Sequence, residues 1–431
     1  MMCSTGTMSS GYWHDKMLKK LLYILILLLL TYSVISLTGC STEERPGFDQ
    51  AINPIWEYHY GVGLSTGIRP ILHENKVLYA SKSVETEDLS ANDQLIALNK
   101  TDGDLLWKWN DHFEDTQQIF DANSLKPVAE GIVAITTGSR NFGIDLGSGQ
   151  TVWKNRNPAS TSSSDLSLVG NDIFRTDIAD PGAGSSLFTE KLMRAPINSG
   201  QWHEVFKVEG GDTLRQGLQI PTHYVNEAGD IVLIFTNTQL STSNNLISPR
   251  LISYNLSRSE INYDVLLESP SQNNAVDWFP LIDDDRIYLA VDDLLICLNL
   301  YSGEPIWQLQ LNANLLFSGF ILVDNQLYAK SEGDGYLWSV NKYTGEVNWK
   351  KPSTGISSSL SYYNDILYFV GDMKLQIVDA TNGETLAEIY APSSWENPND
   401  NFNDFCTVDP ATGKIYLASL SRAYCYPPYQ P

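Results

Sequence analysis

The stretch that decides the fold is Ser339–Trp349, S-V-N-K-Y-T-G-E-V-N-W. Its skeleton is an Asn, a Gly four residues later, and a Trp four residues after that. Recurrence of one skeleton along a chain indicates a repeat architecture and is interpreted before any local feature. The full copies are Asn99–Gly103–Trp107, Asp145–Gly149–Trp153, Asn299–Gly303–Trp307 and Asn341–Gly345–Trp349, and the weaker ones are Asn255–Ser259–Tyr263 and Asp379–Gly383–Ala387.

A second repeated element is a short apolar strand that follows a polar turn. Eight copies occur, at a spacing of roughly 40 to 60 residues, and apolar runs this short between turn residues are typical of β-strands. Eight such units predict an all-β fold, an eight-bladed β-propeller of four-stranded blades. The copies are Val77–Ala80, Ile132–Ile135, Asp172–Phe174, Ile231–Phe235, Ile287–Ala290, Gln326–Ala329, Ile366–Phe369 and Ile415–Ala418.

The chemistry of the skeleton fits a hairpin at the blade edge. Asn or Asp opens a turn by accepting a hydrogen bond from the backbone two residues on. Gly supplies the positive φ that closes the hairpin. The Trp is then expected on the outermost strand, where it covers the seam between two blades.

The repeat count predicts how the ring closes. Residues 191–206 are a degenerate copy around Gly200, and the C-terminal unit, Phe405–Pro428, ends after about three strands. The missing fourth strand is expected at the other end of the chain, in the segment Ile52–Tyr60 that contains Trp56. Pairing of the two ends would remove both exposed edges of an open array.

The first 39 residues have the layout of a secretory signal. Lys19 and Lys20 precede the apolar run Leu21–Leu30, and Leu-Thr-Gly-Cys ends the segment at Cys40. That ending resembles the bacterial lipobox, in which the Cys is acylated, for example with palmitate, and becomes the mature N-terminus. The predicted division is a signal peptide at 1–39, whose true start is expected at Met17, a lipidated linker at 40–51 and one propeller domain at 52–431. A plain transmembrane anchor is the alternative.

The net charge of the chain indicates which classes of partner it can bind. The chain has 28 basic and 51 acidic residues, net −23. The leader carries Lys16, Lys19 and Lys20 against Asp15, net +2, so its removal from 431 residues leaves 392 with net −25. Such acidity disfavours nucleic acid, which is bound through Lys and Arg. A lipid anchor would tether an otherwise soluble domain to a membrane.

The repeat resembles that of pyrroloquinoline-quinone-type (PQQ) propellers, L-x-A-L-N-x-x-T-G-x-x-x-W. The match rests on Leu95–Asn99 with Gly103 and Trp107, and on Leu337–Asn341 with Thr344, Gly345 and Trp349. Members include quinoprotein alcohol dehydrogenases and a lipoprotein of the outer-membrane β-barrel assembly machinery. The lipobox, the mature length and the lack of other domains make the chain more similar to the second. The dehydrogenases use a vicinal Cys-Cys pair, and this sequence has none.

Each candidate for catalysis or metal binding has a simpler structural interpretation. Gly63–Gly67 matches the G-x-S-x-G nucleophile elbow, yet Pro70 follows where a helix is required, and Ser65–Ile68 recurs as Ser353–Ile356. Asp283–Asp285 and Asp292–Asp293 are expected in hairpin turns, although a calcium site would also use such oxygens. No catalytic residue, cofactor or metal site is predicted. The histidines of the mature chain lack paired metal spacing: His59, His73, His112, His203 and His223.

Cysteines and the remaining tryptophans are assigned by position. Cys297 lies in an apolar strand and is expected to be a buried small hydrophobe, whereas pairing of Cys406 with Cys425 stays open. Five tryptophans fall outside the repeat register and are candidates for a glycan or protein contact, with packing as the alternative: Trp109, Trp202, Trp278, Trp338 and Trp395.

Long polar connections indicate which face binds. We interpret five segments as loops between the second and third strands of a blade or between blades, two connection types that share one face. Loops held on a rigid scaffold commonly bind partners. The function expected is a non-catalytic envelope scaffold, with outer-membrane protein assembly implied by the resemblance; the alternatives are a quinone-dependent dehydrogenase and a glycan-binding lipoprotein. The segments are Ser81–Asp93, Thr176–Ser186, Glu209–Gly217, Thr236–Ser248 and Pro392–Asp404.

Overall fold

The computed structural model separates the chain into two units, Met1–Ala51 and Ile52–Pro431, and only the second contains described residues. The predictions for the signal, Met17, Cys40 and the linker therefore lie outside the described residues. The structure describes residues 52–60, 69–82, 93–111, 127–137, 140–156, 160–162, 165–179, 189–211, 214–241, 243, 246–267, 280–311, 320–331, 335–353 and 359–430.

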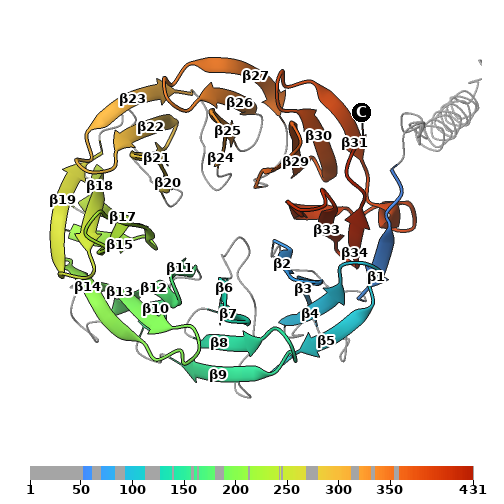
Figure 1. Cartoon of the computed structure of the whole chain (residues 1–431), viewed down its shortest axis with the longest axis horizontal. Coiled ribbons are helices and arrows are strands. Elements are labelled where there is room, and N and C mark those ends of the chain that lie inside the picture. The colour runs from blue at the N-terminus through green and yellow to red at the C-terminus, as the bar shows by residue number, and fades with distance from the viewer. Residues whose placement is uncertain are drawn as a thin grey trace, which may run out of the picture. The chain divides into compact units, whose positions relative to one another are not determined.

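In the second unit the described residues form eight antiparallel sheets, the blades of a ring (Figure 1). The predicted eight-bladed propeller is confirmed. Blade 1 is β2 (Ile71–His73), β3 (Lys76–Lys82), β4 (Asp93–Asn99) and β5 (Leu105–Trp109); blade 2 is β6 (Val128–Ala129), β7 (Ile132–Thr137), β8 (Arg140–Asp145) and β9 (Thr151–Arg156); blade 3 is β10 (Ser160–Ser162), β11 (Ser167–Val169), β12 (Asp172–Ala179), β13 (Thr189–Pro196) and β14 (His203–Glu209); blade 4 is β15 (Leu214–Leu218), β16 (Thr222–Val225), β17 (Ile231–Ser241), β18 (Leu246–Asn255) and β19 (Glu260–Leu266).

The second half of the ring has the same organisation. Blade 5 is β20 (Leu281–Asp283), β21 (Arg286–Val291), β22 (Leu294–Asn299) and β23 (Pro305–Gln310); blade 6 is β24 (Phe320–Val323), β25 (Gln326–Lys330), β26 (Gly335–Asn341) and β27 (Val347–Ser353); blade 7 is β28 (Ser361–Tyr363), β29 (Ile366–Gly371), β30 (Lys374–Asp379) and β31 (Thr385–Ile389); blade 8 is β32 (Phe402–Val408), β33 (Ile415–Ser419), β34 (Arg422–Tyr426) and β1 (Trp56–His59).

The N-terminal strand closes the ring, as the repeat count predicts. β1 pairs antiparallel with β34, from Trp56 opposite Cys425 to His59 opposite Arg422. The strand is shorter than the expected Ile52–Tyr60, because Pro54 has no N–H and pairing starts after it. The two ends of the domain are thus hydrogen-bonded to each other, and the last blade is completed by the first strand.

The eight short apolar strands are the second strands of their blades, not the innermost. Another strand lies inside each of them, and it is the shorter of the two except in blade 8, where β32 is longer than β33. Figure 1 shows β2, β6, β20 and β24 in this inner place, nearer the centre of the ring. In blades 3 and 4 this first strand is interrupted: β10 and β11 both pair with β12, and β15 and β16 both pair with β17. The second strands are buried on both faces because each packs against the two neighbouring blades, which explains their continuous apolar sequence.

Two predicted loops are largely strand. β17 and β18 remain paired from Thr236 opposite Leu251 to Ser241 opposite Leu246, so the predicted connection Thr236–Ser248 is wrong. Glu209–Gly217 is likewise divided between β14 and β15. Polar residues form this hairpin because pairing satisfies the backbone groups without an apolar face. Parts of the three other segments are also strand: Ser81–Lys82, Asp93, Thr176–Ala179 and Phe402–Asp404.

The turn of the Ser339–Trp349 skeleton has the expected chemistry. The Asn341 side-chain oxygen accepts hydrogen bonds from the backbone N–H of Tyr343 (2.9 Å) and of Thr344 (3.1 Å). The Gly345 N–H donates to the Asn341 carbonyl (2.9 Å), at φ +75°. A residue with a Cβ is strained in this left-handed conformation, so Gly is required for the conformation alone.

The skeleton aromatics seal the seams, as predicted, by stacking on the glycine of the following blade. Each also donates a hydrogen bond, 2.6–3.2 Å long, to the carbonyl three residues before that glycine. A methyl group on any of these glycines would meet the ring at 2.9 Å or less. The pairs are Trp56 on Gly103, Trp107 on Gly149, Trp153 on Gly200, Tyr263 on Gly303, Trp307 on Gly345 and Trp349 on Gly383.

The two remaining seams show that aromatic and glycine act as a unit. Between blades 3 and 4, Glu204 occupies the aromatic position and Ser259 the glycine position, with φ +56°. Without a ring above it, a Cβ is tolerated there. Between blades 7 and 8, Ala387 occupies the aromatic position, and Tyr363 stacks on Gly413 instead.

Candidate functional site

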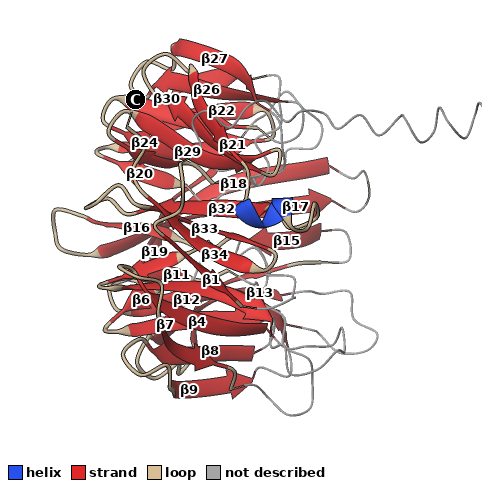
Figure 2. Cartoon of the chain, turned by 90° about the vertical axis from the view of Figure 1, so that its right-hand side faces the viewer, coloured by secondary structure: helices blue, strands red, loops and turns tan. Residues whose placement is uncertain are grey.

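The connection between blades 7 and 8 carries an exposed tryptophan on a short 3-10 helix, η1 (Pro392–Trp395). In an antiparallel blade, connections between the second and third strands and connections between blades leave on one face, and the tight turns leave on the other. η1 therefore belongs to the face predicted to bind, opposite the tan turns at the left edge of Figure 2.

Buried hydrogen bonds hold η1 in place. The Ser393 hydroxyl donates to the Asp400 carbonyl (3.0 Å), and its backbone N–H donates to the Tyr424 hydroxyl (3.2 Å). The Ser394 hydroxyl donates to the Ala391 carbonyl (2.7 Å). Trp395, in contrast, has 53% of its surface exposed. A large aromatic on a rigid support loses little entropy on binding, which is typical of an interface anchor.

Charged side chains lie directly beside this tryptophan. Arg422 on β34 forms ion pairs with Glu396, at the end of η1, and with Glu57 on β1 (3.4 Å). Both carboxylates are largely exposed, whereas the arginine is mostly buried. The surface around Trp395 is thus an apolar centre with a charged rim, an arrangement found at protein interfaces.

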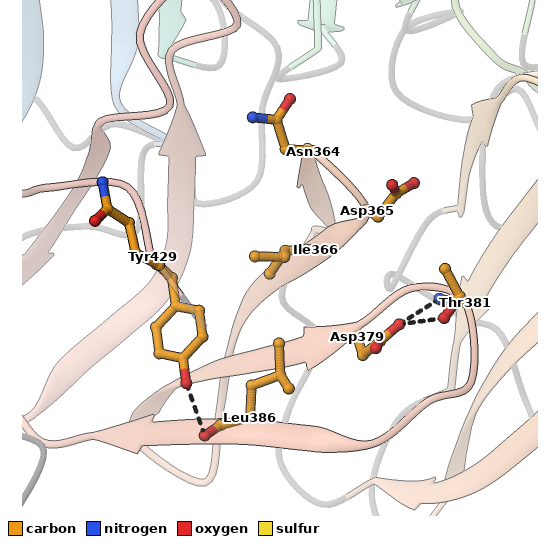
Figure 3. A pocket seen from close by; sticks show the side chains of 8 residues that line it. Asn364, Asp365, Ile366, Asp379, Thr381, Leu386 and Tyr429 are labelled. Carbon is orange, nitrogen blue, oxygen red and sulfur yellow. Dashed lines mark hydrogen bonds between the residues drawn. The ribbon is translucent and has the colours of Figure 1, made fainter.

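A pocket of about 370 Å³ lies on the opposite face, between blade 7 and the C-terminal segment (Figure 3). Tyr429 crosses it and donates a hydrogen bond to the Leu386 carbonyl (3.3 Å). Hydrogen bonds from Thr381 lower the pKa of Asp379, which keeps this wall acidic. The pocket adjoins Ala387, the position at which the repeat lacks its tryptophan.

The tryptophans outside the repeat register divide into buried and accessible ones. Trp109 and Trp338 are each 2% exposed and serve packing. Trp202 is partly buried and lines a second pocket, at the seam of blades 2 and 3. Trp395 is the most exposed of the four that are described, and Trp278 lies outside the described residues.

The predicted hairpin positions of the acidic runs are confirmed. Asp284 and Asp292 adopt positive φ in the turns on either side of β21, and Asp283 forms an ion pair with Lys342. Asp292 is buried rather than solvated. Among the described residues, no group of three or more His, Cys, Asp or Glu side chains is placed to hold a metal ion. Four histidines lie on four different blades, at His59, His73, His203 and His223, and His112 is outside the described residues.

The three cysteines of the described residues are buried free thiols, so Cys406 and Cys425 are not paired. Cys297 is fully buried, as predicted. Burial raises the pKa of Cys406 to about 12 and that of Cys425 to about 11. Each thiol lies on a different strand, and no two cysteines adjoin in the sequence. The vicinal pair of the quinone-dependent dehydrogenases has no counterpart in this sequence.

The serine motif cannot be placed, because Gly63–Gly67 lies outside the described residues; of its repeat, only Ser353 is described, at the end of β27. The described part of the chain contains no helix long and apolar enough to cross a membrane.

Comparison with known proteins agrees with the ring and its repeat. The family model described as outer membrane protein assembly factor BamB, a PQQ-type model, matches residues 53–191 and 258–417. The chain belongs to this family. The match includes strands from all eight blades and omits residues 192–257, which contain Glu204 at the aromatic position; Ser259, at the glycine position, lies just inside the matched residues.

Individual relatives are more distant. The outer membrane protein assembly factor BamB of Legionella pneumophila (strain Paris) is 30% identical over 130 residues, which is 29% of this chain and 30% of that protein. The chain thus matches about a third of the length of this curated relative. The crystal structure of BamB from Moraxella catarrhalis has a TM-score of 0.56 at 14% identity, covering 88% of this chain and 100% of that one.

A protein with a different name shares the fold to the same degree. Sqt1 of Saccharomyces cerevisiae has a TM-score of 0.55 at 8% identity, with 88% of this chain and 100% of that chain covered. At such identities the similarity concerns the fold alone. The sequence-based interpretation identified Trp395 as a candidate by its register, but it missed η1 and both pockets, which depend on contacts between separate blades.

Proposed function

We propose that the chain is a lipid-anchored, non-catalytic scaffold of outer-membrane protein assembly in the cell envelope. The observation that carries the proposal is the family match, which includes strands of every blade of the ring. The family model and the Legionella relative are both named as outer membrane protein assembly factors, and the proposed process is taken from that name. The lack of a vicinal cysteine pair supports a binding role over quinone-dependent oxidoreduction.

The proposed anchor is Cys40, with residues 1–39 removed as a signal and residues 40–51 as the tether. Stable membrane attachment takes two signals, for example two lipid chains, so the proposed anchor requires more than one chain at Cys40. Changing Cys40→Ser should release the protein from sedimented membranes into the soluble fraction. Retention of the Cys40→Ser variant on membranes would contradict the anchor without affecting the scaffold role.

The proposed contact surface is the loop-bearing face around Trp395. Its exposed ring, the buried hydrogen bonds under η1 and the Arg422 ion pairs are the features that support it. A partner of this surface would bury the Trp395 ring. Cationic side chains of the partner would form ion pairs with the rim carboxylates, Glu57 and Glu396. A membrane-embedded β-barrel protein of the assembly machinery is the partner proposed.

The test is affinity purification of the full chain from detergent-solubilised membranes, with a β-barrel partner identified by mass spectrometry. Trp395→Ala should reduce recovery of that partner at least tenfold, since anchor residues commonly contribute over 2 kcal/mol. Tyr301→Ala is the matched control, because Tyr301 is 63% exposed in a tight turn of the opposite face. Absence of any β-barrel partner would refute the function, and equal loss in both variants would refute the surface.

A further inference from the structure

The second pocket lies at the seam between blades 2 and 3 and has a volume of about 520 Å³. Its walls come from β9, the outer strand of blade 2, and from β12, β13 and the turn between β13 and β14 in blade 3. No carboxylate is among the side chains that line it, although the chain as a whole carries a net charge of −23. The main lining residues are Lys154, Arg156, Arg175, Met193 and Trp202, with Trp153 as one wall.

Arg175 is the most unusual member, because a guanidinium is seldom fully buried. It is 1% exposed and contacts Asp177 on the same strand through two atom pairs, Nε–Oδ1 and Nη2–Oδ2, each at 2.9 Å. Its guanidinium carbon lies 4.2 Å from the ring centroid of Trp202. Nε makes its contact with Asp177 without a hydrogen bond, and the third nitrogen, Nη1, is buried with no hydrogen-bond partner among the described residues.

A second donor beside it is also unused. The indole Nε1 of Trp202 is buried without a hydrogen-bond partner in the described part of the chain. Trp153, on the other side of the pocket, donates its indole N–H to the Ile197 carbonyl (2.6 Å) and is fixed between Gly143 and Gly200. An unused buried donor costs about 1–3 kcal/mol, so two in one pocket indicate a missing acceptor.

The charges around the opening favour an anion. Lys154 and Arg156 line the pocket from β9, and Asn155 between them donates to the Gly200 carbonyl (2.7 Å). Asp111, 2.7 Å from Lys154, and Asp177, which pairs with Arg175, are not among the residues that line the pocket. A planar acceptor matches the guanidinium geometry, and the faces of Trp202 and Met193 offer an apolar surface next to it.

From these contacts we infer that the pocket binds a carboxylate attached to an apolar body. The carboxylate accepts hydrogen bonds from Arg175 Nη1 and Trp202 Nε1, and the apolar part lies against Trp202 and Met193. The carboxylate belongs to a free small molecule or to an acidic side chain of a peptide segment. Met193 and Trp202 lie outside the residues that the family model matches, so the site is a feature of this chain rather than of the repeat.

The test uses the full chain labelled with ¹⁵N and follows the indole N–H resonance of Trp202, assigned with a Trp202→Phe variant. The probes are phenylacetate and the capped tripeptide acetyl-Ala-Glu-Ala-amide, with phenylacetamide and acetyl-Ala-Gln-Ala-amide as neutral controls. The resonance should move on titration with a carboxylate and stay in place with its amide. A response to phenylacetate alone identifies a small molecule, and a response to the tripeptide alone identifies a peptide side chain.

Three variants distinguish binding in this pocket from a general electrostatic attraction of carboxylates to the protein. Trp202→Phe keeps the ring over Arg175 and removes one donor, so the carboxylate affinity, measured by calorimetry, should fall about tenfold. Arg156→Gln should weaken binding several-fold and flatten its dependence on salt, whereas Arg258→Gln, an exposed arginine of blade 4, should change neither. Failure of both carboxylates to shift the Trp202 resonance, or equal affinity in the Trp202→Phe variant, would overturn the inference and leave the proposed function standing.

Discussion

The seam between blades 5 and 6 allows the backbone and packing roles of glycine to be measured separately. In Gly345→Ala the new Cβ would lie 2.8 Å from Cδ2 of Trp307, at a position with φ +75°. Gly131→Ala is the matched control, because φ is +72° there and no atom lies within 4 Å of the added Cβ. Both changes force an L-residue into the left-handed region, at about 1–2 kcal/mol.

The two variants differ in whether an aromatic ring lies against the new methyl group: the Trp307 ring does so at Gly345, and no atom does so at Gly131. In Gly345→Ala the Trp307 side chain must move, and its indole N–H loses the Lys342 carbonyl at 2.9 Å. A buried donor left without an acceptor costs about 1–3 kcal/mol. We expect Gly131→Ala to lower the free energy of unfolding by about 1–2 kcal/mol and Gly345→Ala by about 2–5 kcal/mol. Restricting the unfolded chain offsets both changes equally, by less than about 1 kcal/mol.

Urea unfolding measures the difference, with far-UV circular dichroism and tryptophan fluorescence as probes whose transitions must coincide. The double variant Gly345→Ala with Trp307→Ala should lose less stability than the sum of the single changes, since removing the ring removes the clash. Equal destabilisation by Gly131→Ala and Gly345→Ala would refute the argument that the aromatic selects the glycine. So would additive losses in the double variant.

Three further predictions concern the buried carboxyl group of Glu190, the buried thiols, and Ser259, which occupies the glycine position of the repeat. Burial raises the pKa of Glu190 to about 7 from 4.5, so the contribution of this residue to stability is full below pH 4.5 and is lost as the pH rises through 7. Glu190→Gln should remove up to about 3 kcal/mol of the stability difference between pH 5 and pH 8 in urea unfolding, and an unchanged difference would contradict this. Ser259→Gly should stabilise the fold by up to about 1 kcal/mol by relieving φ +56°, and a loss of stability would count against the seam rule. The buried thiols, Cys297, Cys406 and Cys425, should react with iodoacetamide only after unfolding, and peptide mapping of labelled native protein would reveal any exception.

The features that could be predicted from sequence are those that the repeat states many times. Gly103 lies under Trp56 as Gly345 lies under Trp307, so the two glycines have equivalent neighbours in their own seams. One interpretation therefore applies to every seam that keeps both the aromatic and the glycine. The absence of a fourth strand after Tyr426 has one solution in a closed ring, namely pairing with Trp56 and its neighbours. Blade number, closure and seam chemistry therefore follow from local pattern and counting.

What could not be predicted depends on partners in other blades. The polar residues Thr236–Ser241 resemble a loop because pairing with β18, rather than an apolar face, keeps them in a strand. Arg175 alternates with Phe174 as an exposed strand residue would, and its burial follows from the blade that packs over it. Trp202 and Trp338 both fall outside the repeat register, yet one lines a pocket and the other is packed. Sequence register alone does not separate these outcomes.

Two seams lack the aromatic of the repeat, at Glu204 and Ala387, and such departures are where we expect functional surfaces in this fold. At a seam that keeps its aromatic on glycine, the ring fills the space above the glycine, so the pocket beside Trp153 and Gly200 depends on side chains outside the skeleton, such as Trp202. Where Ala387 replaces the ring, the pocket crossed by Tyr429 remains beside it. Glu204 and Ser259 replace both members at the seam of blades 3 and 4, and Glu204 lies in the stretch that the family model does not match. The skeleton of Ser339–Trp349 therefore marks structural positions, and departures from it mark the surfaces open to chemistry specific to this chain.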